Sequence, residues 1–165
     1  AGTGNAPAAP PVGNNPAAGT GDVQVSAGQE AQLNQLPSLD SALSSAFANS
    51  AAPGKQERGG VVGSSQSYVW QQTWCATDEQ TLEESLANIN MQFSVNDQVV
   101  DPSLVTEARA TNAPYSCNIY FVVLSDWTPG NVTLISTLNL LEPVFDGQTI
   151  FPDGNYVYQY NITAQ

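Results

Sequence analysis

The stretch Ala113–Leu124 is the most apolar run in the chain, and it contains Cys117, one of only two cysteines. In an extended conformation Cys117, Ile119, Phe121 and Val123 lie on one face, and the alternate residues Tyr120, Val122 and Leu124 lie on the other. Both faces are apolar. The pattern therefore predicts a central strand that is buried on both sides.

The second cysteine, Cys75, ends the alternating segment Tyr68–Cys75, which also carries Trp70 and Trp74. With no histidine in the chain and the two cysteines far apart, the usual Cys/His zinc spacings are excluded. A disulfide between Cys75 and Cys117 is the simplest interpretation, with two reduced buried thiols as the alternative. A disulfide predicts an extracellular, cell-surface protein.

The chain has 165 residues, which fits one domain with an appendage. Fifteen acidic residues against three basic ones give a net charge of -12, so nucleic acid and anionic membranes are poor partners. The sequence begins at Ala1 with neither a methionine nor an apolar targeting segment, which suggests a mature form after removal of a signal peptide. No run approaches the roughly 18 apolar residues of a membrane span, so membrane insertion is not expected.

Residues 1–22 consist mainly of Ala, Gly and Pro, a composition that cannot bury enough apolar surface to order itself. We therefore expect an extended N-terminal arm. Residues 23–60 are predicted to hold a short strand at Asp22–Ala27, an amphipathic helix at Ser38–Ser50 and a linker at Gly54–Gly63. The main domain is expected to span residues 61–165.

Within that main domain the dominant sequence pattern is the alternation of apolar and polar residues. Ile89, Met91, Phe93 and Val95 alternate strictly with polar residues, and a short helix is expected just before them at Asp78–Ala87. Two further strands follow Pro/Gly turns, one after Trp127–Gly130 and one after Pro152–Gly154. Many short strands joined by such turns predict a mainly β fold, a β-sandwich with one or two short helices.

The Pro/Gly turns followed by aromatic, alternating strands resemble the closing strands of immunoglobulin-like domains of secreted prokaryotic surface proteins, some of them filament or pilus-like subunits. Tyr115-Ser116-Cys117 resembles the Tyr-x-Cys of the immunoglobulin tyrosine corner. The sequence departs from true immunoglobulin domains because Trp70 and Trp74 precede the first cysteine and two strands follow Cys117. Such domains are usually binding, spacer or assembly modules, so the resemblance implies no reaction.

Catalysis is not expected, because without histidine or a free thiol the commonest general bases and nucleophiles are missing. No cofactor is expected. Asp126, Asp146 and Asp153 remain as carboxylates that would hold calcium if they met at one end of the sandwich, although no calcium-loop motif is present. The aromatic residues of the strands would form a sugar-binding platform if several were exposed; otherwise they belong to the core.

The functional hypothesis from sequence is an extracellular structural protein, a filament or surface-assembly subunit that binds copies of itself. The N-terminal arm would add a donor strand to a neighbour, and the helix would dock beside it. The alternative for the arm is that it folds back on its own domain. The alternative is a monomeric adhesion or carbohydrate-binding module that binds cell-surface glycans. The candidate assembly residues are Val12, Val23, Val25, Leu39, Leu43 and Phe47, and the candidate N-glycosylation sites are Asn131 and Asn161.

Overall fold

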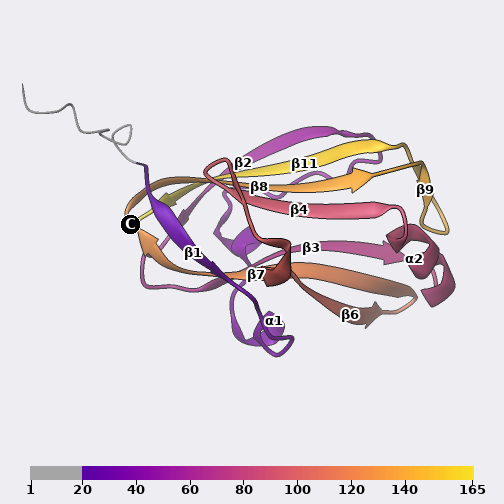
Figure 1. The fold of residues 1–165 in the computed structure, drawn as a ribbon, viewed down its shortest axis with the longest axis horizontal. Coiled ribbons are helices and arrows are strands. Elements are labelled where there is room, and N and C mark those ends of the chain that lie inside the picture. Colours follow the sequence, from indigo (N-terminus) through magenta and orange to yellow (C-terminus); the bar gives the residue numbers. More distant parts are fainter. Residues whose placement is uncertain (1–19) are drawn as a thin grey trace, which may run out of the picture.

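The computed structural model describes residues 20–165 as two β-sheets packed face to face (Figure 1). One sheet has the strand order β2-β11-β8-β4-β5. Its strands are β2 (Gly54–Val62), β4 (Ile89–Val95), β5 (Gln98–Val99), β8 (Gly130–Leu140) and β11 (Gly154–Ala164). All neighbours in it are antiparallel except β2 and β11, which run parallel.

The second sheet is built on β7 (Tyr115–Thr128). On one side β7 pairs with β3 (Tyr68–Ala76), and it also pairs with β1 (Asp22–Ser26) and β6 (Thr106–Asn112) along different halves of its length. A two-stranded hairpin, β9 (Val144–Phe145) and β10 (Ile150–Phe151), completes the strands. The fold is therefore mainly β, an immunoglobulin-like β-sandwich, as the sequence predicts.

Within residues 20–165, four short helical elements connect the strands. They are α1 (Gln32–Gln35), the 3-10 turns η1 (Leu39–Ala42) and η2 (Pro102–Leu104), and α2 (Glu79–Leu86). Asp78 caps α2 by accepting a hydrogen bond from the Thr81 backbone N–H at 2.8 Å, and that bond is the main cause that lowers the pKa of its carboxyl. Figure 1 places α2 and β9 together at one end of the sandwich.

The core lies between the two sheets and follows the predicted alternation. On β8 the side chains of Val132, Leu134, Ser136 and Leu138 are buried, while the residues that alternate with them are partly exposed. Trp70 is completely buried and packs edge-to-face against Phe93 from the opposite sheet, with ring centroids 4.6 Å apart. Packing between the inner faces of two sheets is the main source of stability in such folds.

Strand β7 is buried on both faces, as predicted. Its inward residues Tyr120, Val122 and Leu124 join the central core. On the outer face Phe121 packs with Val69 and Ala108 beneath the leucines of the α1 region. Two faces are covered because the chain folds a helix over the outside of this sheet.

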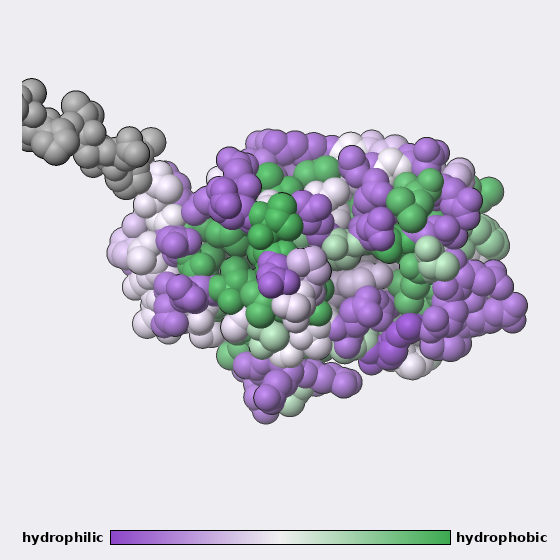
Figure 2. Space-filling model, viewed as in Figure 1, coloured by the Kyte–Doolittle hydropathy of each residue, from purple (hydrophilic) through white to green (hydrophobic). Residues whose placement is uncertain are grey.

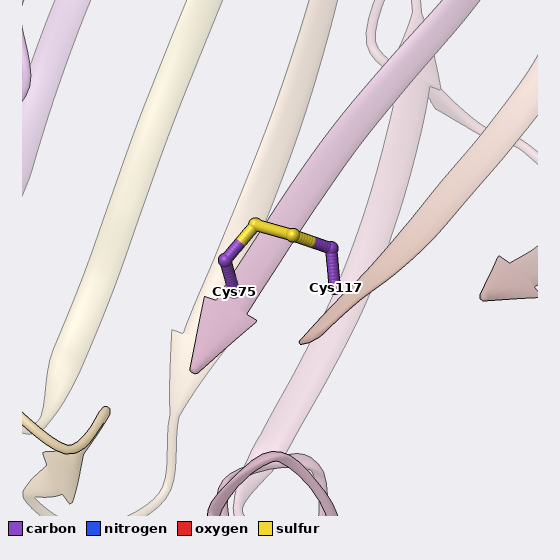
Figure 3. The surroundings of a disulfide bond; sticks show 2 residues. All are labelled: Cys75 and Cys117. Atoms are coloured by element: carbon purple, nitrogen blue, oxygen red, sulfur yellow. A yellow bond between two sulfur atoms is a disulfide. The ribbon is translucent and has the colours of Figure 1, made fainter. Parts of the chain in front are cut away.

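The Cys75–Cys117 disulfide is present, which confirms the prediction (Figure 3). The two residues face each other directly across β3 and β7, with Cα atoms 4.0 Å apart, so the bridge lies within one sheet. In true immunoglobulin domains the bridge joins the two sheets, and the corner tyrosine bonds backbone. Here the Tyr115 hydroxyl donates to Gln148 Oε1 at 3.4 Å. The Tyr-x-Cys resemblance therefore does not extend to the geometry.

The predicted helix at Ser38–Ser50 is wrong. Only η1 forms, and after it the chain runs extended, with a bridge from Leu43 to Gly60. Phe47 then packs edge-to-face on Tyr158 and Tyr160, at centroid distances of 5.3 and 4.9 Å. We call residues 37–53 the strap, because they link the edge of β3 to β2. The apolar residues of the predicted helix contact the core one after another along this strap. Tertiary contacts of this kind override a weak local helix pattern.

The predicted linker Gly54–Gly63 is wrong as well, because Gly54–Val62 forms β2. Its glycines and charges hide the strand from pattern analysis, and such polar residues are tolerated because β2 lies at the edge of its sheet. Residues 23–60, predicted as a separate segment, thus supply most of β1 and most of β2 to the two sheets.

A chain of polar groups runs from the core to the strap. Gln72 Nε2 donates to Ser136 Oγ at 2.8 Å and to the Tyr160 hydroxyl at 3.2 Å. The Tyr160 hydroxyl donates to Asp40 Oδ1 at 2.9 Å. Burial strongly raises the pKa of Tyr160, with a smaller contribution from the Asp40 charge, and burial also raises the pKa of Asp40.

Candidate functional site

The end of the molecule that carries α2 and the β9–β10 hairpin combines exposed apolar side chains with a high density of acid. Phe145 and Ile150 are direct cross-strand partners in the hairpin, and they are 54% and 66% exposed. Leu141, just before the hairpin, is 58% exposed. We call Leu141, Phe145 and Ile150 the hairpin apolar surface. Large apolar side chains gathered on a surface mark interaction sites more often than single ones do.

The hairpin turn is fixed by hydrogen bonds. Asp146 Oδ1 accepts from the backbone N–H groups of Gln148 and Thr149, at 2.8 and 2.7 Å. The Asp146 carbonyl accepts from the Thr77 backbone N–H at 2.9 Å, which ties the turn to the end of β3. Gly147 has φ +100°, and a Cβ there would lie 1.8 Å from Thr77 Oγ1. Only glycine fits this position.

A second tie joins the hairpin to α2. The Ser85 hydroxyl is buried and lies within hydrogen-bonding distance of two carbonyl oxygens, Thr81 O at 2.8 Å and Phe145 O at 3.3 Å. Val144, which precedes Phe145, is buried in the core. The hairpin is therefore held from both sides while Phe145 and Ile150 project outward. Such pre-organised side chains lose little conformational entropy when they bind.

Acidic side chains surround this surface. The α2 region contributes Asp78, Glu79, Glu83 and Glu84, and the hairpin region contributes Glu142, Asp146 and Asp153. Arg109 lies beside them, but it is already paired with Glu79 at 3.4 Å and Glu83 at 2.6 Å. Figure 2 shows the strongly polar surface over α2 next to exposed apolar atoms. The charge favours a cationic partner surface.

Two hollows accompany this end. One, of about 680 Å³, lies between α2, β4 and β6 and is lined by Glu83, Arg109 and Tyr120 among others. The other, of about 450 Å³, lies between the strap, the end of β3 and the hairpin. Burial raises the pKa of Tyr120 in the first hollow, and the nearby Glu107 charge adds to the effect. No histidine is available to act with it as a base.

The structure separates Asp126 from Asp146, two of the three loop aspartates considered from sequence. Asp126 lies near the start of β3, whereas Asp146 binds the residue after its end, so the length of this strand, roughly 30 Å, lies between them. Across residues 20–165 no group of three or more His, Cys, Asp or Glu is arranged to hold a metal ion. The same residues contain no helix long and apolar enough to cross a membrane.

The proposed assembly residues lie within this domain's own packing. Val23 and Leu39 are buried in the core, and Val25, Leu43 and Phe47 pack against it. Val12 falls outside the residues that the structure describes. Strand β1, the expected donor strand, pairs with β7 of its own chain.

The aromatic residues do not form a platform. Most of them are buried in the core, and Tyr158 is partly buried against it. The two sequons face each other across β8 and β11, because Asn131 pairs with Thr163 and Asn161 with Thr133. Both asparagines are exposed, and their glycosylation stays a prediction.

Sequence reasoning missed the hairpin as a site. The signal was present, because Asp146-Gly147 lies between the apolar pairs Val144-Phe145 and Ile150-Phe151, and Asp-Gly between apolar segments is typical of a β-hairpin. What the sequence does not reveal is that Phe145 and Ile150 face solvent while Val144 faces the core.

No protein-family model and no curated protein matches the sequence. Two solved structures are similar in fold. One is PbICP-C in complex with falcipain-2, with 8% identity over 72% of this chain and 96% of that one, at a TM-score of 0.45. The other is the cysteine protease inhibitor EhICP2 of Entamoeba histolytica, with 9% identity over 67% of this chain and 95% of that one, at a TM-score of 0.33.

These findings correct the functional hypothesis from sequence. The similar structures are a protein in complex with falcipain-2 and a cysteine protease inhibitor, not filament subunits or adhesion modules. The assignment as a pilus-like homopolymer with a donor strand is therefore wrong, and so is the alternative of an adhesion or carbohydrate-binding module. The packing of β1 and the strap within their own domain gives the physical reason, because the residues meant for a neighbouring copy are already used.

Proposed function

We propose that this domain is a secreted, non-catalytic binding module whose partner is another protein with an apolar pocket and a basic rim. The observation that carries the proposal is the hairpin apolar surface, which a rigid turn presents in the middle of acidic side chains. The lack of histidine and the use of both cysteines in a disulfide support a role without catalysis. The disulfide also supports secretion.

Phe145 is the expected anchor of the contact. An aromatic side chain that is more than half exposed before binding and stands on an anchored hairpin is the kind of residue that dominates interface energies. The surrounding acids would speed association and make it sensitive to salt rather than supply most of the affinity. Binding should therefore weaken as ionic strength rises, mainly through the association rate.

The partner can be identified by site-specific photocrosslinking. Phe145 is replaced by p-benzoylphenylalanine and the protein is mixed with the secreted proteins of its source; Val99, exposed on β5, is replaced in the same way as the control. The purified partner is then titrated with the wild type, Phe145→Asp and Val99→Asp. We expect Phe145→Asp to weaken binding by roughly 30-fold or more and Val99→Asp to leave it unchanged. Equal binding by Phe145→Asp and the wild type would refute the proposal.

A cysteine protease is tested as one partner, since that is the class inhibited by the E. histolytica protein. The assay follows hydrolysis of a peptide substrate by a papain-like enzyme with increasing amounts of the domain. Inhibition that disappears in Phe145→Asp would identify the partner class. Absence of inhibition would exclude this class and direct the search to the crosslinked partner.

A further inference from the structure

The outer edge of β3 has backbone groups that the fold leaves without strand partners. Val69 donates its backbone N–H to Pro37 O at 2.9 Å, away from β7. Because backbone groups alternate along an antiparallel strand, those of Gln71, Thr73 and Cys75 point to the same outer side. Thr77 continues the series and donates to Asp146 O at 2.9 Å.

The chain thus covers this edge at both ends and leaves its middle open. The strap pairs at Val69 and the hairpin pairs at Thr77, but β3 has no other strand neighbour than β7 within residues 20–165. Thr73 in the centre is exposed. The stretch Gln71–Cys75 also contains no proline and no charge, the two features that usually prevent edge strands from pairing.

A hollow lies directly beside the open edge. It has a volume of about 450 Å³ and is walled by Trp74, Phe151, Tyr156 and Tyr158, with Thr73 and Cys75 at its border. This volume lies within the range of about 300–1,000 Å³ that is typical of ligand pockets. Trp74 and Phe151 form an edge-to-face pair with centroids 4.9 Å apart, so the wall is preformed. In the described part of the chain, the buried Trp74 indole N–H has no hydrogen-bond partner.

We propose that the β3 edge and this hollow form a groove for an extended peptide segment of a partner protein. The peptide's main chain pairs with Gln71, Thr73 and Cys75, and one large apolar side chain enters the aromatic hollow. A strand added to β3 alternates its side chains, so every second residue faces the interior side where the hollow lies. The backbone supplies affinity and the hollow supplies selectivity.

The peptide is expected to carry basic residues on its outward positions. The domain has a net charge of -12, and Asp146 lines the hollow while its Oδ1 already accepts two backbone hydrogen bonds. Lysine or arginine at alternate positions would then face the acidic molecule without entering the hollow. This inference goes beyond the proposed function, because it assigns a second surface and a defined kind of ligand.

The test uses acetyl-Lys-Val-Thr-Phe-Thr-Val-Lys-amide, which alternates apolar and polar residues, and follows binding by amide NMR shifts of the labelled domain up to about 1 mM peptide. Two analogues are N-methylated, one at odd and one at even positions. Pairing along one edge requires that only one of the two lose binding. Retention of binding by both, loss by both, or no binding of the parent peptide would overturn the proposal.

Variants of the domain separate the edge from the hollow. Thr73→Pro removes one outward N–H and leaves the bonds to β7. Thr149→Trp fills the mouth of the hollow from an exposed position. Each should weaken binding at least tenfold, while the control Thr111→Trp, on β6 at the far side of β7, should bind like the wild type. Unchanged binding by Thr149→Trp would disprove the role of the hollow.

Phe145→Asp is included so that the proposed hairpin apolar surface and the proposed groove are tested independently of each other. It should bind the peptide as the wild type does, because Phe145 does not line the hollow. A loss of peptide binding in this variant alone would assign the peptide to the hairpin apolar surface and overturn the groove.

Discussion

The centre of the sandwich and its hairpin end both carry large apolar side chains, but the centre buries them and the hairpin end exposes them. In the centre, Trp70 and Phe93 are fully enclosed and even the Tyr160 hydroxyl has polar partners. At the hairpin end, Phe145 and Ile150 are also large and apolar, but they are exposed to solvent by a turn fixed through Asp146. The difference indicates that stability resides in the centre and recognition at the end, so substitutions should affect one without the other.

The strongest test of this separation is Trp70→Ala. Removing a completely buried indole leaves a cavity between the sheets, and the free energy of unfolding should fall by about 5 kcal/mol. Urea denaturation followed by circular dichroism measures it. A loss below about 1 kcal/mol would show that the centre does not carry the stability assigned to it.

Removing the disulfide should lower the free energy of unfolding almost as much as Trp70→Ala does. The bridge joins cysteines 42 positions apart, and a closed loop of this size corresponds to about 4 kcal/mol in the chain-entropy model. The double variant Cys75→Ser, Cys117→Ser should unfold at a correspondingly lower urea concentration. The same shift should appear when the wild type is reduced, and a variant as stable as the oxidised wild type would contradict the prediction.

A smaller effect is expected at high pH. The folded-state pKa of Tyr160 is raised, so the unfolded chain loses this proton first, near its ordinary pKa of about 10. The stabilisation is therefore present below about pH 10 and is lost as the pH rises above it. Urea titrations at pH 8 and 11 should show the wild type losing more stability than Tyr160→Phe, and equal losses would exclude Tyr160 as the cause.

The smallest effect on stability should come from Phe145→Ala. More than half of this side chain is already exposed, so the free energy of unfolding should change by less than about 0.5 kcal/mol. The matched variant Val144→Ala, one residue earlier but buried, should cost clearly more. Equal losses in the two variants would show that Phe145 is part of the core and not part of a binding surface.

Strong local patterns were enough to predict the central strand, the alternating strands β4, β8 and β11, and the disulfide. Each of these strands has apolar residues at a spacing that only an extended conformation buries, and the disulfide follows from a chain with only two cysteines. The pattern failed for β2 and for the strap. Gly54–Val62 becomes a strand only because β11, far away in sequence, pairs with it. In the strap, Phe47 lies at a helical spacing in the sequence, but its contacts with Tyr158 and Tyr160 form without a helix.

The candidate sites were harder to predict than the fold. Whether Phe145 faces solvent depends on the anchoring of its carbonyl by Ser85, and the open edge of β3 depends on where the strap and the hairpin stop pairing. Both are properties of three segments together, so no single stretch of sequence contains them. The Asp-Gly turn predicts a hairpin, but it does not predict which of its side chains remain free.

The place of β11 in its sheet also constrains how the chain is made. This strand lies between β2 and β8, and its partner β2 precedes it by about one hundred residues. A ribosome therefore releases β2 long before the strand that must lie beside it exists. The five-stranded sheet cannot close during most of synthesis, and its pairing is complete only after β11 has been made.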